Sequence, residues 1–249
     1  MANFQLLNNI DHKDLKILTE RSAALGDNIW YAVTFPAEFR NLQRFYPIFF
    51  TKNPNDGQFE AVAMFGVEDG ENLYLDEYGW NASYIPLNIM RQPFLIGFQE
   101  KERGGETVRE PVITVDMDSP RVNLEQGEPV FLEHGGNSGY LEQVNSILKL
   151  LYQGMSGSKP FFDTLTELEL IESFVLDVQL HDGSEHRLAG FYTINEDVLK
   201  ELDGEKLDML HQKGYLEAIY MAIASMSRIS DLLDIKDEQR KAAMANAED

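Results

Sequence analysis

Cysteine is absent from the 249 residues of the chain. A chain without cysteine forms no disulfide and no thiolate zinc site, and it offers no cysteine nucleophile. This absence fits a reducing compartment. A protein of this length buries roughly 70–75% of the surface of its unfolded chain. We therefore expect an ordinary hydrophobic core to hold the fold without covalent cross-links.

Long apolar runs are also missing. The N-terminus, Met1 to Ile10, has neither a basic start nor the apolar segment of about 7–15 residues that marks a signal peptide. The most apolar stretch, Ala218 to Ala224, is followed by Ser225, Ser227 and Arg228. It falls short of the roughly 18 apolar residues of a membrane helix. We expect a soluble, cytoplasmic protein that does not insert into a membrane.

Basic residues are scarce, with 21 Lys and Arg against 42 Asp and Glu, which gives a formal net charge of −21. Nucleic acids and anionic lipids are bound by clustered Lys and Arg, so neither is an expected ligand. From Asp163 to Glu205 we count 12 acidic residues and 2 basic ones. Such a surface favours solubility, or it meets a basic protein partner.

The first half of the chain reads mainly as short strands. After an irregular start, residues 36–45 predict a short helix, with Pro36 in its first turn. Strands are predicted at residues 48–50, 59–65, 72–75, 94–98 and 112–115. The connections are too short for crossover helices, so the pattern predicts an antiparallel meander.

The second half is more helical. Amphipathic patterns predict helices at residues 140–152 and 160–171, with the glycine-rich segment 154–159 as their linker, and a long helix over 215–233. One hairpin lies between them, at residues 174–193. The fold class is therefore α+β, as a single compact domain over residues 1–236 followed by a charged tail, 237–249, that we expect to fray.

The register of that hairpin can be tested against its hydrophobic pattern. A two-residue turn at Asp182-Gly183 sends Leu188 to the polar face of the hairpin. A three-residue loop pairs Val178 with Leu188, and Phe174 with Tyr192, on one face. Because face consistency is the stronger constraint, the pattern favours the longer loop.

Catalytic signatures are few. The chain has neither the Gly-x-Ser-x-Gly elbow of serine hydrolases nor a phosphate-binding P-loop. Asp116 and Asp118 follow an apolar strand and share a face in an extended chain, a geometry suited to Mg²⁺ or Mn²⁺. Such pairs also end strands without chemistry, and Ser119-Pro120 is typical of a turn. No cofactor is predicted, and a divalent metal enters only under this alternative.

Aromatic residues and arginine gather in the segment 71–94. Trp80, Tyr84 and Arg91 lie there among few charges. Exposed, these residue types are typical of a binding hot spot. Buried, they would be core residues with one paired arginine. Both interpretations stay open, and Trp80, Tyr84 and Arg91 are the candidate binding residues.

The same segment resembles the core motif of the SapC family of bacterial proteins. The resemblance rests on Glu71 to Asp76, Gly79-Trp80, Tyr84-Ile85-Pro86 and Arg91-Gln92-Pro93-Phe94. Further matches occur in the same order at residues 12–16, 37–39, 46–48, 116, 190–196 and 214–216. The family often has two adjacent arginines before Pro-Phe, whereas this chain has Met90-Arg91-Gln92.

The resemblance implies a link to bacterial surface-layer proteins, after which the family is named, and it supplies no catalytic residues. Some members carry a peptide-permease label, which conflicts with a sequence that has no membrane-spanning segment. The leading hypothesis is an accessory protein that binds another protein, one bound for the cell envelope or surface layer. The alternative is an enzyme or enzyme subunit, with a divalent metal at Asp116 and Asp118 or a carboxylate–arginine site near Arg91. A structural role in a surface layer is a third hypothesis.

Overall fold

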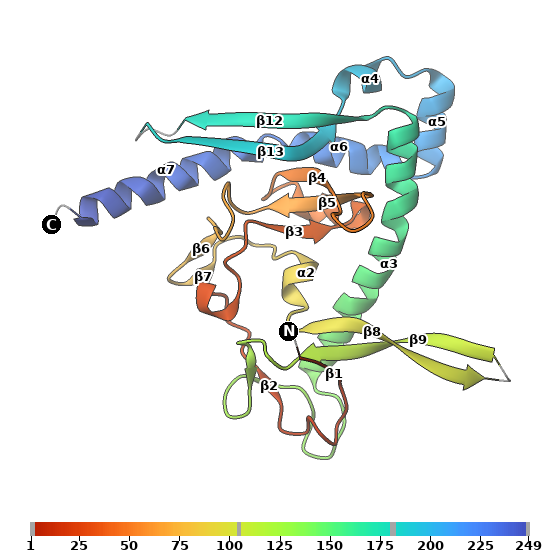
Figure 1. Cartoon of the computed structure of the whole chain (residues 1–249), viewed down its shortest axis with the longest axis vertical. Coiled ribbons are helices and arrows are strands. Elements are labelled where there is room, and N and C mark those ends of the chain that lie inside the picture. Colours follow the sequence, from red (N-terminus) through yellow and green to blue (C-terminus); the bar gives the residue numbers. More distant parts are fainter. Residues whose placement is uncertain (1–2, 104–105, 180–182, 248–249) are drawn as a thin grey trace.

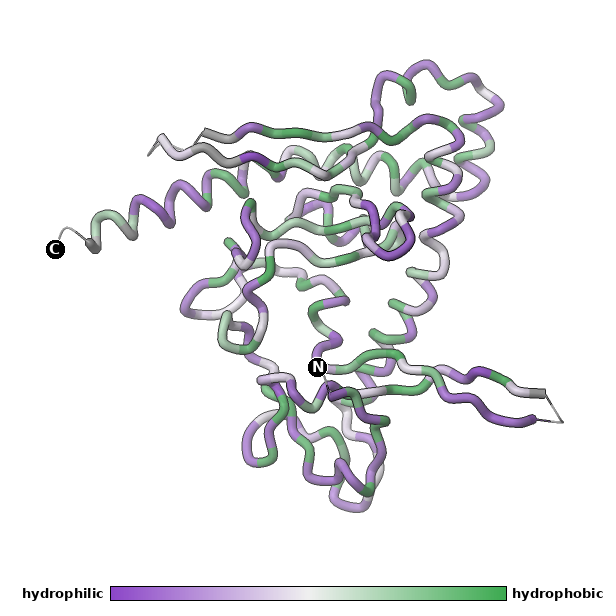
Figure 2. The backbone as a smooth tube through the Cα atoms, in the orientation of Figure 1, coloured by the Kyte–Doolittle hydropathy of each residue, from purple (hydrophilic) through white to green (hydrophobic). Residues whose placement is uncertain are grey.

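The computed structural model describes residues 3–103, 106–179 and 183–247. It contains antiparallel sheets and helices, so the predicted α+β class is confirmed (Figure 1). Hydrophobic residues concentrate in the strands of the largest sheet and along its neighbouring helices (Figure 2). The buried hydrophobic side chains form two clusters, one around the largest sheet and one below it.

The largest sheet has five strands in the order β12-β13-β4-β5-β3, and every neighbouring pair is antiparallel. Its strands are β3 (Tyr31–Thr34), β4 (Ile48–Lys52), β5 (Phe59–Met64), β12 (Ile171–Gln179) and β13 (Glu185–Ile194). The predicted short helix forms as a 3-10 turn, η2 (Pro36–Glu38), that continues into α1 (Phe39–Leu42). Phe39, Leu42, Phe161 and Ile219 are buried in the cluster around this sheet.

The predicted antiparallel pairing is confirmed, but the other strands form separate small sheets and do not continue the large sheet as one meander. Strands β1 (Phe4–Leu6), β9 (Glu106–Asp116) and β8 (Phe94–Arg103) form one sheet, and β10 (Val122–Asn123), β2 (Lys16–Ile17) and β11 (Glu128–Pro129) another. Strands β6 (Leu75–Asp76) and β7 (Gly79–Trp80) pair with each other. The chain leaves the large sheet after Met64 and reaches β8 through α2 (Leu87–Met90). A period-two pattern identifies a strand but not the sheet that it joins.

Helix α3 (Gly139–Glu167) is continuous over 29 residues, about 43 Å at 1.5 Å per residue. Two helices with a glycine-rich linker were predicted here, and that prediction is wrong. Helix α3 packs closely against Phe35 at Gly154. A Cβ at this position would overlap the phenylalanine ring, so the close packing requires glycine. The hydroxyl of Ser138 accepts a hydrogen bond from the amide of Leu141 and caps the helix.

Near its turn, the hairpin of β12 and β13 has neither of the two registers considered, whereas residues 171–174 pair with residues 191–194 in the register of the two-residue turn. Leu176 pairs with Leu188, and Val178 pairs with His186. A bulge between Phe174 and Leu176 then shifts the register, so that Phe174 pairs with Phe191. The bulge inserts an extra residue that a count from the turn cannot anticipate. The tip of the hairpin, residues 180–182, lies outside the described residues.

The C-terminal region contains α4 (Glu196–Lys200), α5 (Gly204–Gln212), α6 (Tyr215–Ser225) and α7 (Arg228–Ala247). The long helix predicted over 215–233 is therefore broken after Ser225. The Ser225 hydroxyl donates to the carbonyl of Ala222 and accepts from the amide of Ile48, which ties the end of α6 to β4. Helix α7 includes most of the segment 237–249 that was expected to fray. No helix within the described ranges has the length and apolarity needed to cross a membrane.

Candidate functional site

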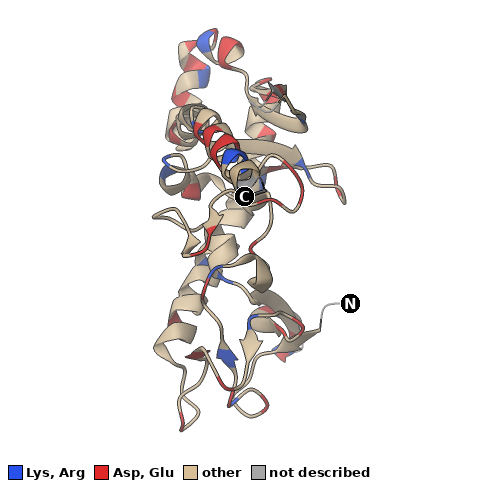
Figure 3. Ribbon diagram, turned by 90° about the vertical axis from the view of Figure 1, so that its left-hand side faces the viewer, with Lys and Arg blue, Asp and Glu red and all other residues tan. Residues whose placement is uncertain are grey.

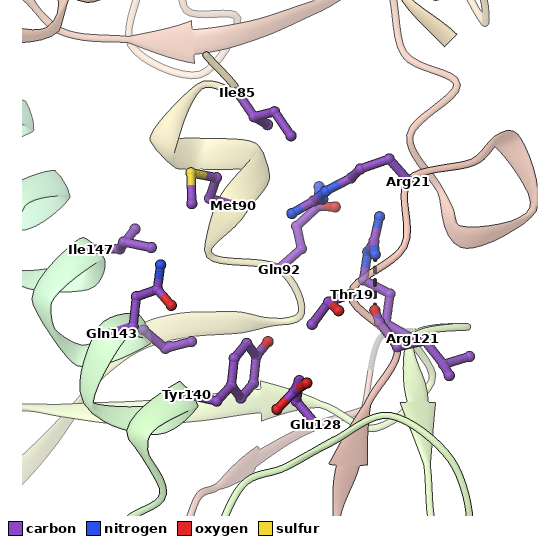
Figure 4. Close-up of a pocket in the computed structure, with 12 residues that line it drawn as sticks. Thr19, Arg21, Ile85, Met90, Gln92, Arg121, Glu128, Tyr140, Gln143 and Ile147 are labelled. Carbon is purple, nitrogen blue, oxygen red and sulfur yellow. Dashed lines mark hydrogen bonds between the residues drawn. The ribbon is translucent and has the colours of Figure 1, made fainter. Parts of the chain in front are cut away.

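A pocket of about 450 Å³ lies between α2, the start of α3 and the segments that flank β2 and β10 (Figure 4). Its volume is within the range of small-molecule sites, roughly 300–1,000 Å³. Apolar residues from α2 and α3 form one part of its wall, and polar residues form the rest. The lining consists of Leu18, Thr19, Arg21, Ile85, Met90, Gln92, Arg121, Glu128, Tyr140, Gln143, Val144 and Ile147.

Two arginines in the wall share one buried carboxylate. The Nη2 atom of Arg121 donates to Oδ2 of Asp27 at 2.6 Å, and Nη1 of Arg21 donates to Oδ1 at 3.2 Å. The side chains of Asp27 and Arg121 are 0% and 1% exposed, whereas that of Arg21 is 13% exposed. We name Arg21, Asp27 and Arg121 the arginine cluster. Its carboxylate offsets one of the two guanidinium charges, so it retains one positive charge.

Loop geometry positions the members of the cluster. Asp27 follows the 3-10 turn η1 (Ala23–Leu25), and its carboxylate also accepts from the amide of Ser22. Nη1 of Arg121 donates to the carbonyls of Leu18 and Glu20, which fixes the segment after β2. The remaining nitrogen of Arg121, Nε, is buried and has no partner in the part of the chain that the structure describes.

Arg21 differs from Arg121 in having two nitrogen atoms that form no hydrogen bond within the described residues. Only its Nη1 atom is hydrogen-bonded, to Asp27 and to the carbonyl of Ile89, and no partner lies within the described ranges for its Nε and Nη2. Burial lowers the pKa of Arg21, and the positive charge of Arg121 lowers it further, while Asp27 opposes both. An arginine keeps its proton near neutral pH in proteins. Arg21 therefore offers charged donors to the pocket.

The other polar groups of the wall are also unused. The side chains of Thr19, Gln92, Tyr140 and Gln143 have no hydrogen-bond partner among the described residues. Figure 4 shows Arg21, Gln92 and Tyr140 extending into the pocket from three different segments. Burial raises the pKa of Tyr140 to about 12, so its hydroxyl stays a proton donor at neutral pH. These groups can bind a polar ligand without breaking an internal hydrogen bond.

A second, shallower cleft of about 330 Å³ brings together Arg91, Asp116 and Asp118. Nε of Arg91 donates to Asn88 at 2.6 Å and Nη1 donates to the carbonyl of Phe94 at 2.7 Å. Oδ1 of Asp116 accepts from the amide of Asp118 at 3.1 Å, as in a turn that ends a strand. Within the described residues, no group of three or more His, Asp and Glu side chains is placed to hold a metal ion.

Trp80 and Tyr84 are half-buried and use their polar atoms inside the protein. The indole N–H of Trp80 donates to the hydroxyl of Tyr46 at 2.8 Å, and that hydroxyl donates to the carbonyl of Tyr84. The Tyr84 hydroxyl donates to Oε1 of Glu38 at 2.9 Å. The contact role predicted for Trp80, Tyr84 and Arg91 stays a prediction. Arg91 also lines the cleft that contains Asp116 and Asp118.

Glu38 is 2% exposed and accepts hydrogen bonds from Thr34, Tyr84 and the amide of Leu87. Burial nevertheless raises its pKa. The folded protein therefore holds this proton more tightly than the unfolded chain does. As the pH rises from the ordinary glutamate pKa, about 4.3, towards the folded-state value, Glu38 reduces the free energy of unfolding.

The Glu38→Gln variant is expected to remove that loss and to keep the fold. A glutamine oxygen can accept from Tyr84 and Leu87, while its amide group faces the Thr34 hydroxyl. Urea unfolding between about pH 4 and pH 8 measures the effect. The free energy of unfolding of Glu38→Gln, relative to that of the wild type, should increase as the pH rises. Glu172→Gln, at an exposed position on β12, is the control. Parallel profiles for the wild type and Glu38→Gln would contradict the prediction.

The arginine cluster was not predicted from the sequence. Arg21, Asp27 and Arg121 are separated by as many as 100 residues, and none of them belongs to a recognisable motif. The signal that could have pointed to the cluster was the scarcity of basic residues. A buried arginine needs a specific partner, so each arginine of an acidic chain is a candidate for a buried ion pair. Gln92 was noted as a departure from the doubled arginine, and it lines the pocket.

The family model described as SapC matches residues 7–232, and this range includes every residue that lines the pocket, as well as Arg91, Asp116 and Asp118 of the second cleft. No curated protein and no solved structure matches the chain.

Proposed function

The chain belongs to the SapC family, and from that premise we propose that it is a soluble, cytoplasmic accessory protein that binds another protein. The observation that carries the proposal is the arginine cluster in the wall of a pocket whose other polar side chains have no partner in the part of the chain that the structure describes. In a chain with a net charge of −21, the arginine cluster gives one part of the pocket wall a local positive charge. It supports recognition of an anionic group that a partner presents.

The acidic surface supports the same proposal. Acidic residues occur along the helices beside the large sheet (Figure 3). A surface of one sign repels partners of like charge and speeds the approach of basic ones. The proposed partner is therefore a protein with basic regions around one anionic group. A protein bound for the cell envelope or the surface layer is the candidate that the family name suggests.

Photo-crosslinking from the pocket rim tests this proposal. Gln143 lines the pocket on α3, and Gln153 is exposed on the same helix and is not among the lining residues. A photo-reactive amino acid at position 143 is expected to capture a protein in the native cell. Capture should fall in the Arg21→Gln background, and position 153 should not capture the same protein. Because a binding protein does not modify its partner, the partner, once it is identified and purified, should keep its mass after incubation with the purified chain.

Two results would contradict the proposal. One is capture of the same set of proteins from both positions, which indicates unspecific contact. The other is capture that does not change when Arg21 is replaced. A covalent change in the partner would instead favour catalysis.

The second candidate function is an enzyme with a carboxylate–arginine site. The observation that favours it is the cleft shared by Arg91, Asp116 and Asp118. A divalent metal there would meet the positive charge of Arg91, so the metal form of this hypothesis has less support than the metal-free form. If Mg²⁺ or Mn²⁺ raises the thermal midpoint of the wild type but not of Asp116→Asn, the metal form is favoured instead.

A further inference from the structure

The donors of Arg21 define the kind of anion that fits the pocket. Its Nε and Nη2 atoms are without partners in the described part of the chain, and only the Nε of Arg121 is both buried and unpaired there. The two free nitrogens of Arg21 are therefore open to the pocket. They lie on one edge of the guanidinium plane, where two parallel N–H groups match the two oxygens of a carboxylate.

The net charge of the pocket wall favours a ligand with one negative charge over a ligand with two. Two guanidinium groups and the Asp27 carboxylate sum to one positive charge, +2 − 1 = +1. Glu128 lies on the same wall and adds a negative charge at an exposed position. With Glu128 counted, the wall is neutral, so a phosphate dianion would leave two excess negative charges beside Glu128, whereas a carboxylate would leave one. The positive end of the α3 dipole, at Tyr140 and Gln143, adds to the attraction for an anion.

The remainder of the lining describes what the carboxylate is attached to. Ile85, Met90, Val144 and Ile147 form the apolar part of the wall. Gln92, Gln143 and Tyr140 are uncommitted groups that can hydrogen-bond to an amide next to the carboxylate. A volume of about 450 Å³ holds more than an isolated acetate-sized anion.

We propose that this pocket binds a carboxylate that carries an apolar substituent, and that Arg21 contacts the carboxylate directly. The inference rests on the proposed function, since it names the anionic group that the partner would present. Two sources share this chemistry, namely the C-terminal carboxylate of a polypeptide and a free small acid. Asp27 and Arg121 act as positioning residues that hold Arg21 in place.

Titration calorimetry with four probes separates the sources. The probes are a peptide that ends in a free leucine carboxylate, the same peptide with a C-terminal amide, N-acetyl-leucine and inorganic phosphate. Binding of the acid peptide without the amide peptide supports both the inference and the proposed function. Binding of N-acetyl-leucine without either peptide supports the inference and overturns the protein partner. Binding of phosphate in preference to every carboxylate overturns the inference, and so does binding of none of the probes.

Variants of the pocket make the assignment specific. Loss of a charge-assisted pair weakens binding by about 10- to 100-fold, and this is the effect expected of Arg21→Gln on the probe that binds. Arg21→Lys keeps the charge but loses the planar pair of donors, so its effect should be intermediate. Arg40→Gln, which removes an arginine from an exposed ion pair with Glu217, should leave binding unchanged.

A second pair of variants covers the case in which Arg21→Gln does not fold. Gln143→Glu places a negative charge on the pocket wall without disturbing a hydrogen bond within the described residues, and Gln153→Glu adds the same charge to the same helix outside the pocket. Binding should weaken in the first variant and stay unchanged in the second. Equal binding by Gln143→Glu and Gln153→Glu would overturn the assignment of the pocket.

Discussion

Replacing Asp27 by alanine is expected to reduce the free energy of unfolding by about 3–5 kcal/mol, the usual cost of removing one partner of a buried ion pair. The reason is the position of Arg121, whose side chain is 1% exposed and whose charge is offset by Asp27. Without that carboxylate, two guanidinium groups lie close together in a poorly solvated region. The amide of Ser22 also loses its acceptor. Urea unfolding, followed by circular dichroism, measures the difference.

Two further variants show whether charge is the cause. Asp27→Asn keeps the volume of the side chain and one oxygen acceptor, so its loss should be smaller than that of Asp27→Ala. Asp163→Asn removes an exposed carboxylate that pairs with Lys159 four residues earlier, and it should cost less than about 0.5 kcal/mol. If Asp27→Ala were as stable as Asp163→Asn, the arginine cluster would not need its carboxylate. The role given to Asp27, that of offsetting the buried charge of Arg121, would then be wrong.

Gly154→Ala is expected to destabilise the protein by about 1–3 kcal/mol, the cost of overpacking, although alanine is the better helix former. A Cβ at this position would overlap the ring of Phe35, which is 4% exposed and has little room to move. Gly157 lies three residues further along α3, and nothing lies within 4 Å of a Cβ placed there. Gly157→Ala should therefore stabilise the protein by up to about 1 kcal/mol.

The opposite signs of these two substitutions are the test, because both glycines lie in the same helix. Thermal unfolding of both variants gives the comparison. Phe35→Leu removes part of the ring that the new Cβ would meet, so Gly154→Ala should cost less in that background than in the wild type. A stabilising effect at both glycines would show that helix propensity alone governs α3 and that Phe35 can move aside.

The same two glycines show why a break in α3 was wrongly predicted from the sequence. The segment 154–159, which contains Gly154 and Gly157, was interpreted as a linker because glycine weakens helices on average. In the structure, the missing Cβ at Gly154 permits close packing against Phe35, a residue more than 100 positions earlier in the chain. Local propensity is a weak predictor wherever such tertiary packing decides the conformation.

Strands with strong local patterns were predicted well, since they need little tertiary information. Residues 48–50 and 59–65 lie in β4 and β5, or directly beside them, and residues 94–98 and 112–115 lie in β8 and β9. Their division into separate sheets was not predictable, because it depends on where the segment between Met64 and Phe94 takes the chain. The hairpin register failed for a related reason, the bulge beside Phe174.

The candidate site was the least predictable part. Ion pairs such as Asp27 with Arg121 join segments 94 residues apart, and a single sequence carries no signal for such a pairing. Arg91, Asp116 and Asp118 were each singled out, and the structure brings them to one cleft. Their proximity follows from the antiparallel pairing of β8 with β9, in which Phe94 lies opposite Val115.

Helix α3 makes the two hydrophobic clusters depend on each other. Its first half supplies Leu141, Val144 and Leu148 to one cluster, and its second half supplies Phe161 and Leu165 to the other. Loss of either cluster would expose buried residues of a helix that the other cluster also uses, so we expect the protein to unfold cooperatively in one transition. For the same reason, a ligand held by the first turns of α3 would protect backbone amides of the distant sheet from hydrogen exchange.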